Sequence, residues 1–197
     1  MTEPHSYHHG DLRNALLQSA RRQLEEHGFE NVSVAKAAAE AGVSVAAPYR
    51  HFADRAALLG ELAAIGFGEL AEALGAVPAH GGPRERMIQS GVAYLQYADE
   101  HPQMFRLMFT HNRRASVGEA GQQSLTALRS LGDAIAGGGR LAVPQATAVR
   151  VLWGLVHGLA MLRIGHLPAL AQVAVVDHRA DIEAALDGVG LPERPAP

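Results

Sequence analysis

One stretch of the chain decides its fold: residues 32–55 read VSVAKAAAEAGVSVAAPYRHFADR. These residues predict a short helix that starts at Ser33 and stops before Gly42, followed by a second helix from Ser44 to Phe52. Two short helices joined by such a turn form a helix-turn-helix, the unit whose second helix enters the major groove of DNA. An ordinary αα-hairpin has the same spacing and is the alternative.

The turn itself has residues suited to this layout. Gly42 can adopt the positive φ that ends the first helix without steric cost. Ser44 is expected to cap the second helix through its hydroxyl. The first turn of that helix then holds three residues that would face base edges, Val45, Ala46 and Ala47. Their methyl groups suit contact with thymine methyls better than bidentate hydrogen bonding.

The remainder of the chain is helical in pattern as well. No stretch alternates apolar and polar residues for six positions, so we expect an all-α fold of about nine helices. The helices expected outside the quoted stretch cover about residues 11–27, 55–74, 84–100, 102–109, 116–136, 144–165 and 177–186. Asp11 is the expected N-cap of the first of them.

Composition excludes several classes of function. The chain has 197 residues, a net charge of −3 and no cysteine, which removes thiolate catalysis, Cys–zinc sites and iron–sulfur clusters. It lacks a Gly-x-Ser-x-Gly elbow and a phosphate-binding glycine loop, so we expect no enzyme and no cofactor. Only His5 and His9 have i, i+4 spacing among eleven histidines, so no metal site is expected.

Charge and hydropathy also limit the partners. Residues 1–55 carry six basic and seven acidic side chains, so any binding of DNA depends on local placement of charge. The first residues do not form a signal peptide. The most apolar stretch, residues 149–167, is interrupted by Arg150, His157 and Arg163. We therefore expect a cytoplasmic protein with no membrane partner.

In its first 75 residues the sequence resembles the tetracycline-repressor (TetR) family of bacterial transcriptional regulators. The matching features, in order, are Ser33 at a helix start, Ala-Gly-Val-Ser at 41–44, Tyr-x-His-Phe at 49–52, Asp54-Arg55 and Leu58-Leu59. The resemblance covers about residues 10–75. Farther on, Trp153, His157 and Gly158 look like the Trp-x-x-x-His-Gly signature of one C-terminal domain type of the family.

The resemblance implies both an architecture and a function. It implies a DNA-binding domain in residues 1–55, a helical ligand-binding and dimerisation domain in residues 56–191, and a tail in residues 192–197. It further implies a homodimeric repressor that binds a palindromic operator and is released by a small-molecule effector of unspecified identity. A ligand-blind or activating DNA-binding regulator is one alternative, and a small-molecule carrier or enzyme on the same scaffold is another.

The resemblance also implies contacts with phosphates. In the family, the Tyr and His of Tyr-x-His-Phe, here Tyr49 and His51, reach phosphate oxygens. Ser33 at a helix N-terminus is placed to offer a hydroxyl, and Lys36 and Arg55 would add cationic contacts. Half-buried packing is the alternative for Tyr49, and a hydrogen bond at a helix end is the alternative for His51.

One residue departs from the family pattern. Pro48 stands at the fourth position of the second helix, where many members carry Leu, so this helix should begin tightly and be short. No Arg, Asn or Gln precedes Tyr49 in it. Base readout should therefore be sparse, and specificity should depend on DNA shape and phosphate geometry.

Glycines in the expected helix at 144–165 suggest a dimer interface. Gly154, Gly158 and Gly165 share one face. Because each interior glycine costs about 0.5–1 kcal/mol relative to alanine, their grouping suggests that something approaches the backbone closely. A partner helix across a two-fold axis fits, with Ile182 and Leu186 of the last helix taking part. Close packing within one subunit is the alternative.

The resemblance implies a ligand pocket in the same region. Its expected wall comprises Tyr94, Tyr97, Phe105, Met108, Phe109, Trp153, His157 and Met161. Aromatic and Met side chains at helical spacing fit a plain core equally well. His157 needs a hydrogen-bond partner on its apolar face, and it is either a satisfied core histidine or a ligand contact.

Overall fold

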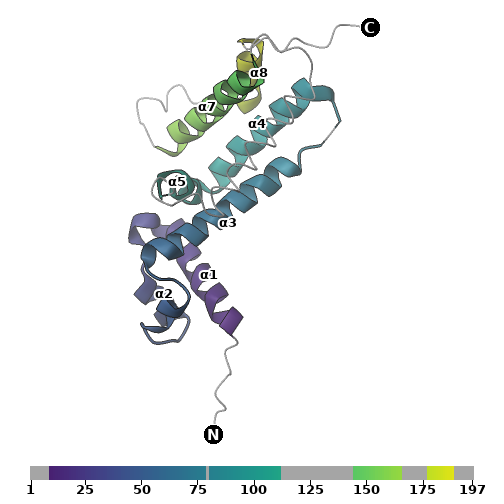
Figure 1. The fold of residues 1–197 in the computed structure, drawn as a ribbon. Coiled ribbons are helices and arrows are strands. Elements are labelled where there is room, and N and C mark those ends of the chain that lie inside the picture. Colours follow the sequence, from purple (N-terminus) through teal and green to yellow (C-terminus); the bar gives the residue numbers. More distant parts are fainter. Residues whose placement is uncertain (1–8, 79, 112–143, 166–176, 189–197) are drawn as a thin grey trace. The chain divides into compact units, whose positions relative to one another are not determined.

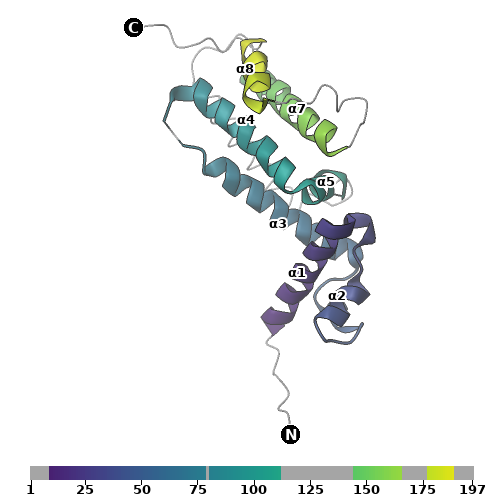
Figure 2. The same cartoon turned by 180° about the vertical axis from the view of Figure 1, so that it is seen from behind.

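The structure is a computed structural model that describes residues 9–78, 80–111, 144–165 and 177–188. These residues form α-helices and short 3-10 helices and contain no strand, which confirms the all-α class (Figures 1 and 2). The α-helices are α1 (His9–His27), α2 (Val34–Glu40), α3 (Arg55–Gly75), α4 (Gly82–Glu100), α5 (Pro102–His111), α7 (Gln145–Ile164) and α8 (His178–Gly188).

The expected count of about nine helices is too high for the described residues, which contain seven α-helices. The segment from Ser44 to Phe52 forms only a turn and a 3-10 helix, Ala47–Arg50. A further expected helix, at 116–136, lies outside the described residues. Helix α1 begins at His9, so Asp11 lies in its first turn and is not its N-cap.

The described chain divides into two compact units, which we describe separately. The first comprises residues 1–66 with 103–116, and the second comprises residues 67–102 with 117–197. The first unit extends beyond the expected DNA-binding domain at residues 1–55 because α5 and the first half of α3 belong to it. In α5, Met104 and Met108 close over the backbone of α3, where an added Cβ at Gly66 would lie 2.8 Å from each side chain.

The core of the first unit follows the predicted apolar stripes. Leu16, Ala20 and Leu24 of α1 are at most 1% exposed, and so are Leu58, Leu59 and Leu62 of α3. Gly28 ends α1 with a φ of +78°, as predicted, and its amide donates to the Leu24 carbonyl at 2.9 Å. Gly28 thus sets where α1 ends, immediately before the segment that leads into α2.

In the second unit, α4 packs against α7 and α8. An added Cβ at Gly91 of α4 would lie 2.6 Å from Cδ1 of Ile182, so this glycine lets α4 and α8 approach closely. The carboxylate of Asp99 on α4 accepts two hydrogen bonds from Arg163 of α7, at 2.8 and 2.7 Å. Its Oδ2 also lies 3.1 Å from Nε2 of His178 on α8, so Asp99 joins all three helices.

Helix α7 is long and apolar. By length and composition alone, Ala146–Ile164 could cross a membrane, a property that core helices of water-soluble proteins share. On one face of the helix, Leu152, Val156, Ala160 and Ile164 are at most 7% exposed. Val151 and Leu162, on another face, are 48% and 46% exposed. Helix α7 therefore has an inner apolar face and an outer one.

Candidate nucleic-acid interface

The first helix of the predicted helix-turn-helix is built as expected. Ser33 is the N-cap of α2, and its hydroxyl accepts a hydrogen bond from the Lys36 amide at 3.3 Å. Gly42 follows the helix with a φ of +68°. The Val43 amide then donates to the Ala38 carbonyl at 3.0 Å, which closes the turn. This segment confirms the turn geometry predicted from the Ala-Gly-Val-Ser sequence.

The second helix is much shorter than predicted. The Ala47 amide donates to the Ser44 carbonyl at 3.0 Å, and a single 3-10 turn follows, with Ala46 and not Ser44 at its N-cap position. No side chain caps this turn, so the expected cap at Ser44 was wrong. Pro48 explains the difference, because it has no N–H to donate and its carbonyl accepts from both His51 and Phe52 at 2.9 Å.

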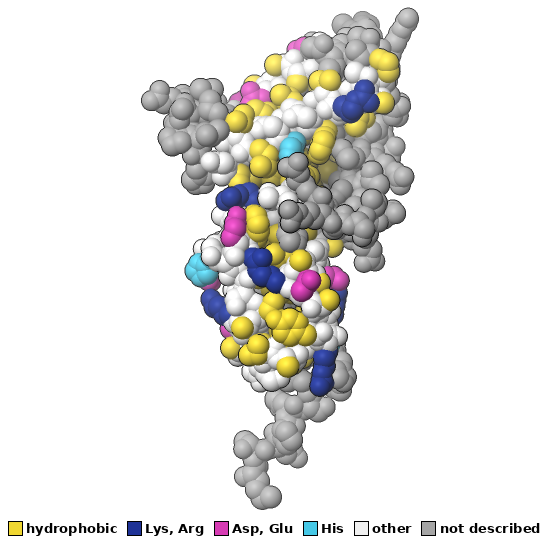
Figure 3. Space-filling model, turned by 60° about the vertical axis from the view of Figure 1, so that its left-hand side comes forward, with side chains coloured by type: hydrophobic (Ala, Val, Ile, Leu, Met, Phe, Trp, Pro, Cys, Tyr) yellow, Lys and Arg dark blue, Asp and Glu magenta, His cyan; other side chains and the backbone are white. Residues whose placement is uncertain are grey.

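This short turn displays apolar side chains to solvent. Val45 is 58% exposed and Tyr49 is 53% exposed, although large apolar side chains are usually buried. Ala46 is exposed too, whereas Ala47 and His51 are half-buried. Figure 3 shows hydrophobic side chains at the surface of the first unit, with Lys and Arg side chains near them. The exposure of Tyr49 argues against its alternative of half-buried packing.

Phe52 and Arg55 anchor the turn from behind. Phe52 is 3% exposed, and the Arg13 guanidinium lies 5.6 Å from its ring centroid. Arg55 donates from Nε to the Val32 carbonyl at 2.8 Å and from Nη2 to the carbonyls of Phe29 and Glu30. Sequence reasoning placed Arg55 on a phosphate and missed these bonds. They make Arg55 a clamp between the start of α3 and the segment before α2.

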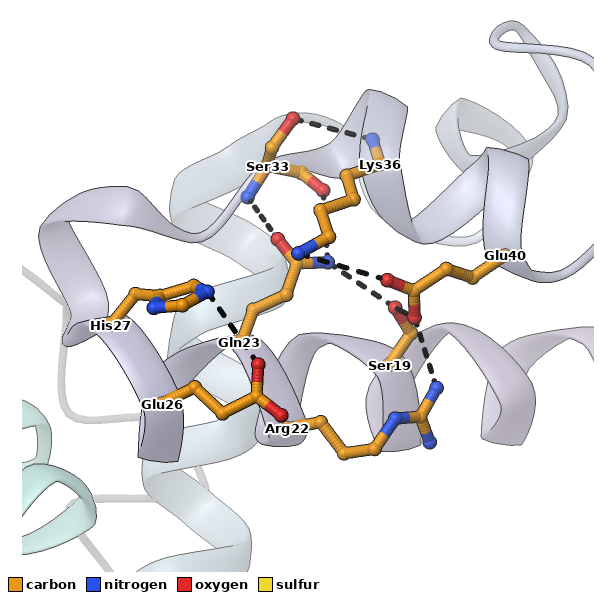
Figure 4. Close-up of polar contacts among 8 residues, drawn as sticks. All are labelled: Ser19, Arg22, Gln23, Glu26, His27, Ser33, Lys36 and Glu40. Carbon is orange, nitrogen blue, oxygen red and sulfur yellow. Dashed lines mark hydrogen bonds and ion pairs between the residues drawn. The ribbon is translucent and has the colours of Figure 1, made fainter.

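A polar network fastens α2 to α1 (Figure 4). The amide of Gln23, only 2% exposed, accepts from the Ser33 N–H at 2.9 Å and donates to the Ser19 hydroxyl oxygen at 3.2 Å. Ser19, 1% exposed, in turn donates to Glu40 at 2.6 Å. The network therefore grips both ends of α2. The signal that sequence reasoning overlooked was the pair of polar residues at i, i+4, 19 and 23, on the apolar face of α1.

Of the expected sensor residues, three come together between α4 and α7. The Tyr94 hydroxyl lies 3.1 Å from Nδ1 of His157, and the indole of Trp153 stacks on the imidazole with centroids 5.3 Å apart. Burial lowers the pKa of His157 and raises the pKa of Tyr94. The partner that the imidazole needs is thus present within the chain, which favours the core interpretation of His157.

The other expected wall residues belong to both units. Phe105, Met108 and Phe109 belong to the first unit, where the rings of Phe105 and Phe109 lie 4.8 Å apart. In the second unit, the Tyr97 hydroxyl donates to Glu69 at 3.2 Å, and Met161 is half-buried. Of the eight residues, three thus belong to the first unit and five to the second.

The predicted dimer residues divide into two groups. Among the described residues, added Cβ atoms at Gly154 and Gly158 would meet nothing within 4 Å. Gly165 is the exposed C-cap of α7. In contrast, Ile182 and Leu186 are 2% and 0% exposed within this chain. The expectation that they face a partner was wrong, because both are buried within their own protomer, with Ile182 packed against Gly91 of α4.

Two family models match the chain. The model described as bacterial regulatory proteins, tetR family, matches residues 16–62. The model described as tetracyclin repressor-like, C-terminal domain, matches residues 87–187. Neither match shows the Trp-x-x-x-His-Gly signature, which stays a prediction.

Solved structures share the fold of this chain. A protein of unknown function from Rhodococcus sp. RHA1 is 30% identical, with a TM-score of 0.78 over 96% of this chain and 100% of that one. A TetR transcriptional regulator from the same organism is 19% identical, with a TM-score of 0.65 over 95% and 100%. PfmR, a TetR family transcriptional regulator from Thermus thermophilus, is 22% identical, with a TM-score of 0.64 over 91% and 99%. No curated protein matches the chain.

Proposed function

The chain belongs to the TetR family and is a DNA-binding transcriptional regulator, and from this premise we propose that it is a repressor released from its operator by a small molecule. The observation that carries the proposed DNA contact is the exposed pair Val45 and Tyr49. Both sit on a turn that is held from behind by Phe52 and Arg55. A rigid support with exposed apolar tips suits insertion into a groove, where the Val45 methyls would meet thymine methyls.

Phosphate contacts would fix the register of this turn on the duplex. We assign them to Ser33, Lys36, Tyr49 and His51, which lie at the ends of α2 and of the 3-10 turn. Lys36 is exposed and carries the only full charge of the four at neutral pH when His51 is neutral. Replacing it should weaken binding to operator and random DNA alike, with a salt slope lower by about one unit per subunit.

The outer face of α7 supports a homodimer. The exposed Val151 and Leu162 flank Gly154 and Gly158, where a second backbone could approach. A two-fold dimer would present its reading turns to two half-sites of a palindrome, about 34–36 Å or a multiple of that distance apart. The proposed partners are thus a second copy of this chain and double-stranded DNA, in the cytoplasm and away from membranes.

The proposed sensor lies between α4 and α7. Tyr94, Trp153 and His157 join α4 to the helix that carries the dimer face, so a ligand that separates them would act directly on subunit orientation. Such a ligand shifts the equilibrium between the DNA-binding and the released conformation only as far as its affinities for the two differ. We propose no catalytic role for these side chains.

One binding experiment tests the proposal against its rivals. Labelled duplex from the region upstream of the protein's own coding sequence is titrated in anisotropy measurements, with a scrambled duplex of equal length as control. Preferential binding of the upstream duplex is expected. Equal binding of both, or none, would favour a carrier or enzyme on this scaffold. If no small molecule from a metabolite panel releases the bound duplex, the protein is ligand-blind or an activator.

A further inference from the structure

The carboxylate of Glu40, the last residue of α2, is shared by two cations (Figure 4). Its Oε2 accepts a hydrogen bond from Nη2 of Arg22 at 2.9 Å. Its Oε1 lies 4.0 Å from Nζ of Lys36, one turn back along α2. Both cations are exposed, with about half of each side chain accessible to solvent. Glu40 therefore lies between positive charges on the proposed DNA-binding domain.

This carboxylate is fixed in place. The buried Ser19 hydroxyl donates to Oε2 at 2.6 Å, which orients the group on α1. The Ser19 and Arg22 hydrogen bonds lower the pKa of Glu40 below its ordinary value, so the group is charged at neutral pH. This fixed negative charge lies next to Lys36, a side chain that we propose binds phosphate, and it therefore affects DNA binding. It attracts the same cations as a phosphate does, and it repels the phosphate itself.

We propose that Glu40 competes with DNA phosphates for Lys36 and Arg22 and thereby lowers the affinity of this protein for DNA of any sequence. This inference rests on the proposed DNA interface. Binding of random DNA depends almost wholly on phosphate contacts, whereas an operator adds base contacts, here from the exposed Val45 and Tyr49. An internal competitor for phosphates therefore weakens binding to random DNA and to the operator by a similar factor, and it lowers the amount of protein held on random sites.

The test is Glu40→Gln, which keeps the size of the side chain and an oxygen that can accept from Ser19 while removing the charge. Binding to a random duplex is measured by anisotropy between about 50 and 200 mM KCl. We expect affinity at the low-salt end to rise about two- to tenfold, the range of one or two exposed ion pairs. The salt slope should steepen by about one unit per subunit. A merely structural role for Glu40 would instead weaken binding.

Glu25→Gln is the matched control, because Glu25 also pairs with an arginine on α1, Arg21 at 2.9 Å, and the net charge changes equally. The gain from Glu40→Gln should exceed the gain from this control. It should also fall by more than half when Lys36→Gln is already present, because the competition then has one cation fewer. Glu40→Ala provides the same measurement if the glutamine variant does not fold.

Equal gains from the two glutamine variants would overturn the inference, as would a gain that is independent of Lys36. Such results would leave the proposed function intact as long as the wild-type protein binds the upstream duplex preferentially. If the wild-type protein binds neither duplex, the proposed function itself fails. The two failures are therefore distinguishable.

Discussion

Replacing Arg55 by alanine separates its two possible roles. The change removes a charged donor from the carbonyls of Phe29, Glu30 and Val32. A hydrogen bond from a charged group contributes about 1.5–3 kcal/mol, but only the bond to Val32 is shielded from solvent. We therefore expect a loss of about 2–3 kcal/mol in the free energy of unfolding, or about 5–10 °C in Tm.

Thermal unfolding followed by circular dichroism measures this loss. Arg50→Ala is the matched control, because Arg50 is an exposed arginine in the neighbouring 3-10 helix, and its removal should change Tm by less than about 2 °C. The salt dependence of DNA binding by the Arg55→Ala variant is the second measurement. If Arg55 is a clamp, Arg55→Ala keeps the wild-type salt slope at temperatures where it is folded. An unchanged Tm with a slope lower by about one unit per subunit would refute the clamp and make Arg55 a phosphate ligand.

Three further predictions concern the second unit. Gly158→Leu should convert a dimer into a folded monomer in light scattering, because an added Cβ at this position meets nothing among the described residues of the protomer; a dimeric leucine variant would move the interface elsewhere. Hydrogen bonds from Arg179 and Gln89 lower the pKa of Glu85 to about 2, so its stabilisation is present above the unfolded pKa of about 4.3 and disappears as pH falls toward 2. Glu85→Gln should flatten Tm between about pH 5 and 2, and an identical acid profile would contradict the shift. Tyr94→Phe removes the hydroxyl partner of His157 and should cost about 1–2 kcal/mol of unfolding free energy by urea titration, unless another group satisfies the imidazole.

Local chemistry explains which features could be predicted from the sequence. The stripe of Leu16, Ala20 and Leu24, the Ser33 cap and the positive φ of Gly42 each depend on residues within one or two turns of each other. Such features follow from helical period, capping and backbone sterics. The family resemblance added the identity of the helix-turn-helix, which spacing alone left open against an αα-hairpin.

The features that were missed depend on residues distant in sequence. Arg55 meets carbonyls 23 to 26 positions earlier, and Ser19 meets Glu40 at a separation of 21. No periodicity reports such a pairing, because a polar residue on an apolar face indicates only that some partner must exist. Ile182 was misplaced for a related reason. The pattern of α8 shows that it has an apolar side, and only the packing against Gly91 shows which surface covers that side.

The short recognition turn constrains how this protein can read DNA. An α-helix of three turns would offer several side chains to successive bases, whereas one 3-10 turn after Ser44 exposes only two large apolar side chains, Val45 and Tyr49, and ends on the exposed Arg50. Val45 has no hydrogen-bonding group, and Tyr49 has a single hydroxyl, so neither can make the bidentate contacts that distinguish guanine or adenine. Discrimination by these two side chains must then come from thymine methyls and from groove geometry. With so few base contacts, phosphate contacts supply most of the affinity for operator and random DNA alike. A fixed anion at Glu40 therefore matters more in this protein than it would beside a longer reading helix.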